Sequence, residues 1–344
     1  MINKDNYKSL DQNILELNEE LDRQESNTSC FLVKSANQWI NEAKTRPIPK
    51  LLFDSFWFEG ELCILFADTN VGKSILAVQI ANSISQGIAI EGFKIETSAK
   101  KVAYFDFELS DKQFEKRYSN NYKDHYQFHD NFLRAEINTE AEIPKEHKNF
   151  EDYLCASFED VITKHEAEVL VIDNITYLKN DNERAKDALL LMKHLKSINK
   201  TYGVSILVLA HTPKRDASKP ITKNDLAGSK MLMNFCDSAF AIGESSTCPS
   251  SRYLKQVKQR NTEQVYHSDY VPVFKINNPF NFLLFQFNEF GSEIDHLKQF
   301  DVNDRLDRDN RVIELKNDNL PNTTIAKELG ISEGTVRNIL KKAA

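Results

Sequence analysis

Short apolar runs alternate with helix-like segments through the middle of the chain. The runs CILFA, VAYFDF, VLVID and SILVLA are rich in β-branched and aromatic residues and show no polar alternation. Such runs are typical of strands that are buried on both faces of a parallel sheet. Helices are predicted between them, over residues 73–86 and about 185–202, with a helical insertion between the second run and the third. The pattern therefore predicts an α/β core with a mainly parallel central sheet.

Three later β-like runs predict an extension of this sheet. They lie at residues 238–242, 253–257 and about 282–287, and we expect them to form an antiparallel flank. After them, residues 291–310 are polar and dense in charge without an apolar period, which is typical of a linker.

The N-terminal part of the chain predicts two helices. Within residues 6–25, apolar residues recur at spacings of four, three and four on one stripe of an otherwise charged segment: Leu10, Ile14, Leu17 and Leu21. This helix is too short for an independent coiled coil, so it either packs on its own domain or docks on a neighbouring subunit. A second helix is predicted over residues 35–44, and two prolines after it end the pattern.

Composition and charge exclude several classes of protein. The 344 residues carry a formal net charge of -7, which argues against a uniformly basic nucleic-acid coat but allows local basic patches. No stretch approaches the roughly 18 consecutive apolar residues of a membrane span, and the polar start is unlike a signal peptide. We therefore expect a cytoplasmic protein with no membrane association. The five cysteines contain no CxxC pair, so neither a disulfide framework nor a zinc site is indicated.

A phosphate-binding loop is predicted directly after the first apolar run. FADTNVGKS, residues 66–74, matches the pattern GxxxxGK followed by Ser or Thr, with alanine in place of the first glycine. In such a loop backbone amides wrap the phosphates of ATP, the lysine reaches the β and γ oxygens, and the serine supplies a hydroxyl ligand to Mg2+. The predicted nucleotide-binding residues are Ala67, Asp68, Thr69, Asn70, Val71, Gly72, Lys73, Ser74 and Ile75.

Polar residues end the other three strands. Asp173 ends VLVID, and we expect it on the strand next to the P-loop strand, where a carboxylate is suited to bind Mg2+ together with Ser74. Glu108 lies just beyond Asp106 in VAYFDFELS. It either orients the attacking water or is a surface residue of a turn. His211 ends SILVLAH and either senses the γ-phosphate or is a satisfied histidine at a strand end; the residues alone favour the second interpretation.

The order of these segments resembles that of the RepA-type RecA-fold ATPases, relatives of the hexameric replicative helicases. The resemblance covers residues 47–265 and includes FDFELS, VLVIDN, LAHTPKR, LAGSKMLMNFCDSAFAI and LKQVKQRNTE. It implies that Glu108 activates water, that His211 is a polar sensor, and that Lys258 and Arg260 form a finger pair for the γ-phosphate of the adjoining subunit. ATP hydrolysis would then need a homo-oligomer, a ring such as a hexamer or a filament. Charge pattern alone would make Lys258 and Arg260 a solvated strand face.

The loop at residues 212–225 follows His211 and carries several basic residues, among them Lys214 and Arg215, but no aromatic residue. The family resemblance implies that it lines a central channel. There, contact with the DNA backbone without base readout is expected, because stacking needs aromatic side chains. The alternative is a flexible surface loop.

Three short helices are predicted near the C-terminal end, with Gly330 in the turn before the last. IAKELGISEGTVRNIL resembles the helix-turn-helix of response-regulator and resolvase-type DNA-binding domains. In that interpretation the last helix enters the major groove of DNA. Six basic and four acidic residues over 311–344 give weak DNA affinity to a single copy, and a protein-docking module is the alternative. The predicted DNA contacts on the last helix are Thr335, Arg337, Asn338 and Lys341.

The sequence therefore predicts four parts. They are an N-terminal helical segment (1–46), a RecA-like ATPase core (47–290), a linker (291–310) and a helix-turn-helix module (311–344). The favoured function is a DNA-associated ATP hydrolase, with helicase activity as a further step, acting with replication or mobilisation proteins of a plasmid, phage or mobile element. The alternative is an ATP-switched, site-specific DNA-binding regulator or recruitment factor without unwinding activity. A third option, a P-loop kinase of a small molecule, needs no finger from a second subunit.

Overall fold

The computed structural model describes residues 31–174, 184–213, 215–226, 229–298 and 302–343. The chain divides into two compact units, Met1–Pro49 and Lys50–Ala344. In the first unit, α2 (Ala36–Ala43) confirms the second predicted helix. Ser35 and Gln38 cap its start by exchanging side-chain and backbone hydrogen bonds. The amphipathic helix predicted over 6–25 lies outside the described residues.

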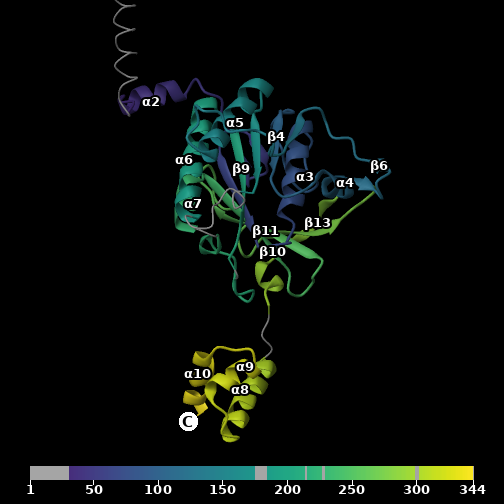
Figure 1. Cartoon of the computed structure of the whole chain (residues 1–344), viewed down its shortest axis with the longest axis vertical. Coiled ribbons are helices and arrows are strands. Elements are labelled where there is room, and N and C mark those ends of the chain that lie inside the picture. Colours follow the sequence, from purple (N-terminus) through teal and green to yellow (C-terminus); the bar gives the residue numbers. More distant parts are fainter. Residues whose placement is uncertain (1–30, 175–183, 214, 227–228, 299–301, 344) are drawn as a thin grey trace, which may run out of the picture. The chain divides into compact units, whose positions relative to one another are not determined.

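A nine-stranded sheet is the centre of the second unit (Figure 1). Among the described residues its strand order is β13-β12-β11-β10-β3-β9-β8-β4-β7. All neighbours from β10 to β7 are parallel, so the predicted α/β fold, a RecA-like core with a mainly parallel sheet, is confirmed. The strands are β3 (Leu62–Ala67), β4 (Val102–Asp106), β7 (Phe132–Ala135), β8 (Val169–Asp173), β9 (Ser205–His211), β10 (Ser238–Glu244), β11 (Ser251–Lys258), β12 (Val271–Asn277) and β13 (Leu284–Gly291).

Helices cover the sheet on both faces, with α3 on one side and α5, α6 and α7 on the other (Figure 1). Strand β3 shows why this is required. Cys63 and Leu65 lie in the core that includes α3, whereas Ile64 and Phe66 lie in the core that includes α5 to α7, because successive strand side chains point to opposite faces. The helices are α3 (Lys73–Gln86), α4 (Asp111–Arg117), α5 (Phe150–His165), α6 (Arg184–Tyr202) and α7 (Ser229–Phe235).

The flank of the sheet differs from the prediction in two respects. The run at 238–242 forms β10, which pairs parallel to β3 and belongs to the main sheet. The antiparallel flank consists of β11, β12 and β13, and β12 was not predicted. That strand contains Pro272, and its second half is only partly buried, so it lacks the apolar run that marks the other strands. Two short hairpins, β1 (Leu51–Phe53) with β2 (Trp57–Phe58) and β5 (Ser119–Asn120) with β6 (Asp124–His125), complete the strands.

The C-terminal part forms the three predicted helices. They are α8 (Val302–Asn317), α9 (Asn322–Glu328) and α10 (Glu333–Ala343). Their shared core contains Val312, Leu315, Ile325, Ala326, Val336 and Ile339, and Gly330 adopts a left-handed conformation between α9 and α10. The linker prediction is wrong in extent: residues 293–296 form a 3-10 helix, and α8 begins at residue 302. A charged helix with a sparse apolar face resembles a linker in sequence, since only one side of it is buried.

Candidate functional site

The P-loop connects β3 to α3 at the carboxyl edge of the parallel strands. Gly72 lies at the N-terminus of α3 with φ of +109°, and Asn70 has φ of +62°. A Cβ atom on Gly72 would lie 2.9 Å from the ring of Phe285, so both the conformation and the space require glycine. The loop therefore directs backbone amides and the N-terminus of a 14-residue helix toward one point, which is the geometry that binds phosphate.

Lys73 is held inside this loop. Its Nζ donates hydrogen bonds to the carbonyl oxygens of Ala67 (3.1 Å) and Asp68 (2.8 Å) and lies 3.1 Å from Nδ1 of His211. Burial lowers the pKa of Lys73, and the carboxylates of Asp173 and Glu108 act in the opposite direction. The Nζ of Lys73 thus lies at the phosphate-binding site, where it can exchange these two carbonyl oxygens for phosphate oxygens.

Asp173 at the end of β8 is fully buried. Its Oδ2 accepts a 2.5 Å hydrogen bond from the Tyr104 hydroxyl, while its Oδ1 accepts none from the described residues. Burial raises the pKa of Asp173 to about 6, and the Ser74 hydroxyl acts to lower it. An orphaned carboxylate oxygen beside a serine at the start of α3 fits the hard oxygen ligands that Mg2+ prefers. The residues present therefore fit the predicted metal role of Ser74 and Asp173.

One expectation about Asp173 is wrong. The strand that carries it is not the neighbour of the P-loop strand, because β9 lies between β3 and β8. This places His211, at the end of β9, between the P-loop and the acidic residues. The sequence could not show this, since strand order depends on how the crossover helices return to the sheet.

Glu108 forms a cluster with Asn174 and His211. The Asn174 amide donates to Oε1 of Glu108 and lies 3.0 Å from Nε2 of His211, and Nε2 of His211 is 3.7 Å from Oε1 of Glu108. The bond with His211 is the main cause that lowers the pKa of Glu108, which keeps the carboxylate ionised at neutral pH. An ionised carboxylate at this position can orient or accept a proton from water.

His211 connects the lysine to this cluster. An ammonium donates only, so Nδ1 of His211 accepts from Lys73, and Nε2 on the other side of the ring faces Oε1 of Glu108 at 3.7 Å. His211 is thus in contact with the P-loop on one side and with Glu108 on the other, which favours the sensor interpretation over that of a satisfied strand-end histidine.

Asp106 shapes the turn that presents Glu108. Its Oδ1 accepts the backbone amides of Glu108 (3.2 Å) and Leu109 (2.9 Å), and its Oδ2 accepts from Nε of Arg134 (3.0 Å). Arg134 also donates to the carbonyl oxygen of Leu109 at 2.8 Å. Asp106 and Arg134 therefore fix the backbone of the turn, and Glu108 is the acidic residue that remains to contact substrate.

Lys258 and Arg260 do not reach the P-loop of their own chain. Lys258 pairs with Ala239 at the start of β10, which is the end of the sheet opposite the P-loop. Its Nζ donates to the carbonyl oxygens of Met233 and Cys236. Arg260 forms an ion pair of 3.0 Å with Asp237. Any contact of these cations with a γ-phosphate therefore requires a second copy of the chain.

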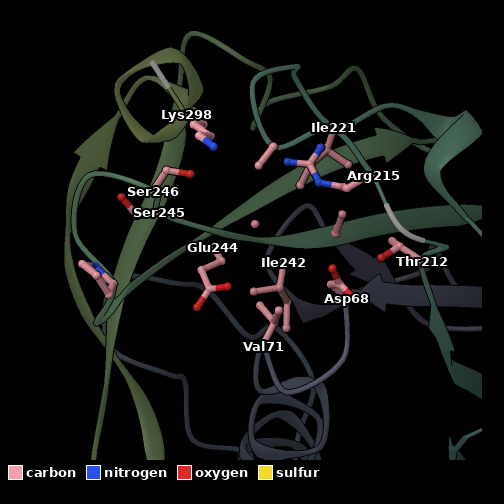
Figure 2. A pocket seen from close by; sticks show the side chains of 14 residues that line it. Asp68, Val71, Thr212, Arg215, Ile221, Ile242, Glu244, Ser245, Ser246 and Lys298 are labelled. Carbon is pink, nitrogen blue, oxygen red and sulfur yellow. The ribbon is translucent and has the colours of Figure 1, made fainter. Parts of the chain in front are cut away.

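A cavity of about 430 Å³ adjoins the P-loop on the β10 side (Figure 2). Asp68 and Val71 of the loop line it, together with Thr212 and Arg215 of the segment after β9. The Thr212 hydroxyl is buried and has no hydrogen-bond partner among the described residues. Arg215 thus lies beside the nucleotide site, whereas Lys214 lies outside the described residues. The predicted DNA contacts on α10 belong to the C-terminal module.

Sequence reasoning missed Tyr104 and Asn174 as parts of the site. Asn174 directly follows Asp173, so its position after an acidic strand end was a usable signal. Tyr104 gave none, because its contact with Asp173 depends on the pairing of β4 with β8.

Comparisons with known proteins identify the family of the chain. The family model described as AAA domain matches residues 28–217, more than half of the chain. No curated protein matches the chain significantly. A KaiC-like protein from the hyperthermophilic archaeon Pyrococcus horikoshii aligns with a TM-score of 0.46 at 15% identity, over 70% of this chain and 99% of that one. Among the described residues no helix has the length and apolar character for a membrane crossing. The chain belongs to the AAA domain family of P-loop ATPases.

Proposed function

We propose that this P-loop ATPase is an oligomeric, DNA-associated motor or switch of the RepA type. It would hydrolyse ATP between subunits, with replication or mobilisation proteins of a plasmid, phage or mobile element as its partners. The observation that carries the proposal is the combination, in one chain, of a P-loop site, two cations at the end of the sheet opposite to it, and a C-terminal module that resembles a helix-turn-helix.

The residues at the site support hydrolysis. The P-loop amides bind the phosphates, and Lys73 exchanges its carbonyl partners for β and γ oxygens. Ser74 and Asp173 would hold Mg2+, which neutralises charge on the phosphates and aligns them for in-line attack. Glu108 orients the attacking water, and Asn174 holds its carboxylate. His211 contacts both Lys73 and the Glu108 cluster, so it can link phosphate binding to the position of the base.

The finger of the proposed interface is assigned mainly to Arg260. Its side chain is 51% exposed, and besides Asp237 it donates only a long hydrogen bond of 3.4 Å to the carbonyl oxygen of Asn234 among the described residues. Exposed ion pairs of this kind contribute about 1 kcal/mol or less. Lys258 is more buried and donates to two backbone carbonyls. Arg260 can therefore leave Asp237 for the phosphate of an adjoining subunit at small cost, whereas Lys258 would leave backbone acceptors unpaired.

The exposed face of α10 supports DNA association. Asn338 and Lys341 are exposed, and Arg337 is 67% exposed with Glu333 as its ion-pair partner at 2.6 Å. Thr335 is partly buried, and its amide and hydroxyl both bond to Ser332 at the helix start. Arg337, Asn338 and Lys341 are thus the proposed contacts with bases and phosphates, whereas Thr335 is the residue whose amide the Ser332 side chain caps. Several modules on one oligomer would raise the weak affinity of each through effective concentration.

Concentration-dependent ATPase activity with and without DNA tests this function. We expect activity per subunit to rise with protein concentration, to rise further with single-stranded DNA, and to coincide with oligomer formation in size-exclusion chromatography. Full activity of a monomer would contradict the proposal. A strand-displacement assay on forked DNA then separates a motor from the DNA-binding regulator, which would hydrolyse ATP without unwinding.

A further inference from the structure

Arg252 lies on β11 where this strand passes the P-loop. The residue is buried, with 8% of its surface exposed. Its Nε donates a 3.1 Å hydrogen bond to the carbonyl oxygen of Val71, the P-loop residue directly before Gly72. A strand of the antiparallel flank therefore holds a backbone carbonyl of the phosphate-binding loop.

The guanidinium of Arg252 is fixed on its other sides as well. Nη1 donates to the carbonyl oxygens of Pro249 (2.7 Å) and Ser251 (2.9 Å), and Nη2 lies 2.9 Å from Oε1 of Glu244. Because the guanidinium is planar and rigid, these bonds set the direction in which Nε points. The group is thus a fixed donor for Val71, and not one that follows the movements of the loop.

Holding the Val71 carbonyl also aims the amide of Gly72. The two groups belong to one planar trans peptide, in which C=O and N–H point in opposite directions. With the carbonyl of Val71 turned to Arg252, the N–H of Gly72 points away from β11. The ring of Phe285 and the side chain of Ile276 lie close to Gly72 from the same flank, so three strands, β11, β12 and β13, fix the orientation of this peptide.

Glu244 holds the guanidinium from the side of the cavity. It lines the cavity of about 430 Å³ together with Val71 and Asp68 (Figure 2), and 54% of its side chain is exposed. The anchor of Arg252 is therefore a carboxylate at the surface next to the P-loop.

We propose that Arg252 is a positioning residue for the P-loop. It aims the Gly72 amide at the bound phosphates through the Val71 peptide, and Glu244 keeps the guanidinium in place. The proposal rests on phosphate binding by the P-loop and is independent of DNA association and of a finger from a second subunit.

Binding of a fluorescent ADP analogue to the full chain, without hydrolysis, tests this role. Arg252→Lys retains the charge but offers a single ammonium that cannot serve all four acceptors. We expect it to raise the Kd for ADP and the KM for ATP about ten-fold, with kcat changed less than about three-fold, since the lost contact acts on ground state and transition state alike. Glu244→Gln should raise the Kd about three-fold. Glu91→Gln, the same change at an exposed site, should have no effect.

Two results would overturn the proposal. One is an unchanged Kd for ADP in Arg252→Lys; if that variant does not fold, an unchanged Kd in Glu244→Gln has the same meaning. The other concerns the double variant. Because Glu244 acts through Arg252, the double variant should bind ADP no more weakly than Arg252→Lys alone. If the losses of the two single variants add up in the double variant, Glu244 and Arg252 act independently and the proposal is wrong. A failure of DNA binding or of oligomer formation would leave the ADP measurements as they are, so the two proposals fail separately.

Discussion

The hydroxyl of Tyr104 donates a 2.5 Å hydrogen bond to Oδ2 of Asp173, from β4 to the adjacent strand β8. Both side chains are fully buried. The bond orients one carboxylate oxygen and leaves Oδ1 without a hydrogen bond from the described part of the chain. A hydrogen bond of this kind behind a metal ligand fixes its direction, and its loss typically lowers metal affinity about 10- to 100-fold.

Tyr104→Phe should therefore weaken the binding of Mg2+. We expect the Mg2+ concentration for half-maximal ATPase activity to rise about ten-fold, because the carboxylate of Asp173 loses its orientation. A titration of ATPase activity with Mg2+ at saturating ATP measures this half-saturating concentration. Tyr270→Phe removes a hydroxyl from a partly exposed ring and serves as the control. Equal half-saturation in the two variants would show that Tyr104 only fills space.

Glu108→Gln should bind ATP and fail to hydrolyse it. Glutamine keeps the size of the side chain and the acceptor for the Asn174 amide, but it cannot take a proton from water. We expect kcat to fall by about 100-fold or more, with the Kd for ATP changed less than about two-fold. Single-turnover hydrolysis and equilibrium binding measure the two quantities. Glu140→Gln, at an exposed site, is the control, and normal turnover by Glu108→Gln would remove the water-activating role.

The P-loop, Asp173, Glu108 and His211 could be predicted because each follows an apolar strand, and parallel strands bring their carboxyl ends to one edge. The core of the C-terminal module was also predictable, since Val336, Ile339 and Leu340 are spaced for one face of α10. These features depend on neighbours in sequence, and local patterns encode them.

Tyr104 and Arg252 could not be predicted because their roles depend on strand pairing. Tyr104 reaches Asp173 only because β4 lies beside β8, and Arg252 reaches Val71 only because β11 crosses the sheet next to β10. In the sequence, Tyr104 is only an aromatic residue within one strand, and Arg252 is only a charged residue near the start of another. The first half of helix α8 was predicted as a linker for a different reason. Its sequence pattern is local, but charged residues dominate it.

The buried carboxyl of Glu61 should make the free energy of unfolding depend on pH. The residue is buried, and burial raises the pKa of its carboxyl above the ordinary value of 4.5, although hydrogen bonds from Ser238, Phe58 and Asn261 act in the opposite direction. A raised pKa means that the folded state disfavours the ionised form, so the stability contributed by Glu61 is full below pH 4.5 and falls as pH rises above it. Glu61→Gln should thus gain stability relative to the parent between pH 5 and 8. Urea unfolding at several pH values measures this, and a constant difference would contradict it.

Mixing two inactive variants tests the finger of the adjoining subunit. Lys73→Ala removes the phosphate ligand and keeps Arg260, whereas Arg260→Ala keeps the P-loop and removes the finger. Each alone should lose most of its ATPase activity. If the finger acts between subunits, a mixture forms interfaces that combine an intact P-loop with an intact Arg260, and activity should return to about a quarter of the parent level by random assortment. A mixture as inactive as its components would exclude the role in trans. Arg311→Ala, at an exposed site of α8, provides the control.

Removal of the C-terminal module should separate DNA binding from ATP hydrolysis. The deletion must begin at residue 302, because a cut at 311 would divide α8 and leave residues 302–310 of this helix without the module core on which it packs. Deleting residues 302–344 should weaken binding of duplex DNA by about ten-fold or more, while basal ATPase activity stays within about two-fold of the parent, since the P-loop site takes no residue from this segment. Asn338→Ala with Lys341→Ala in the full chain should weaken DNA binding in the same direction without altering the module core, and fluorescence anisotropy at fixed salt measures both. If neither variant changes DNA affinity, the three helices serve protein docking instead.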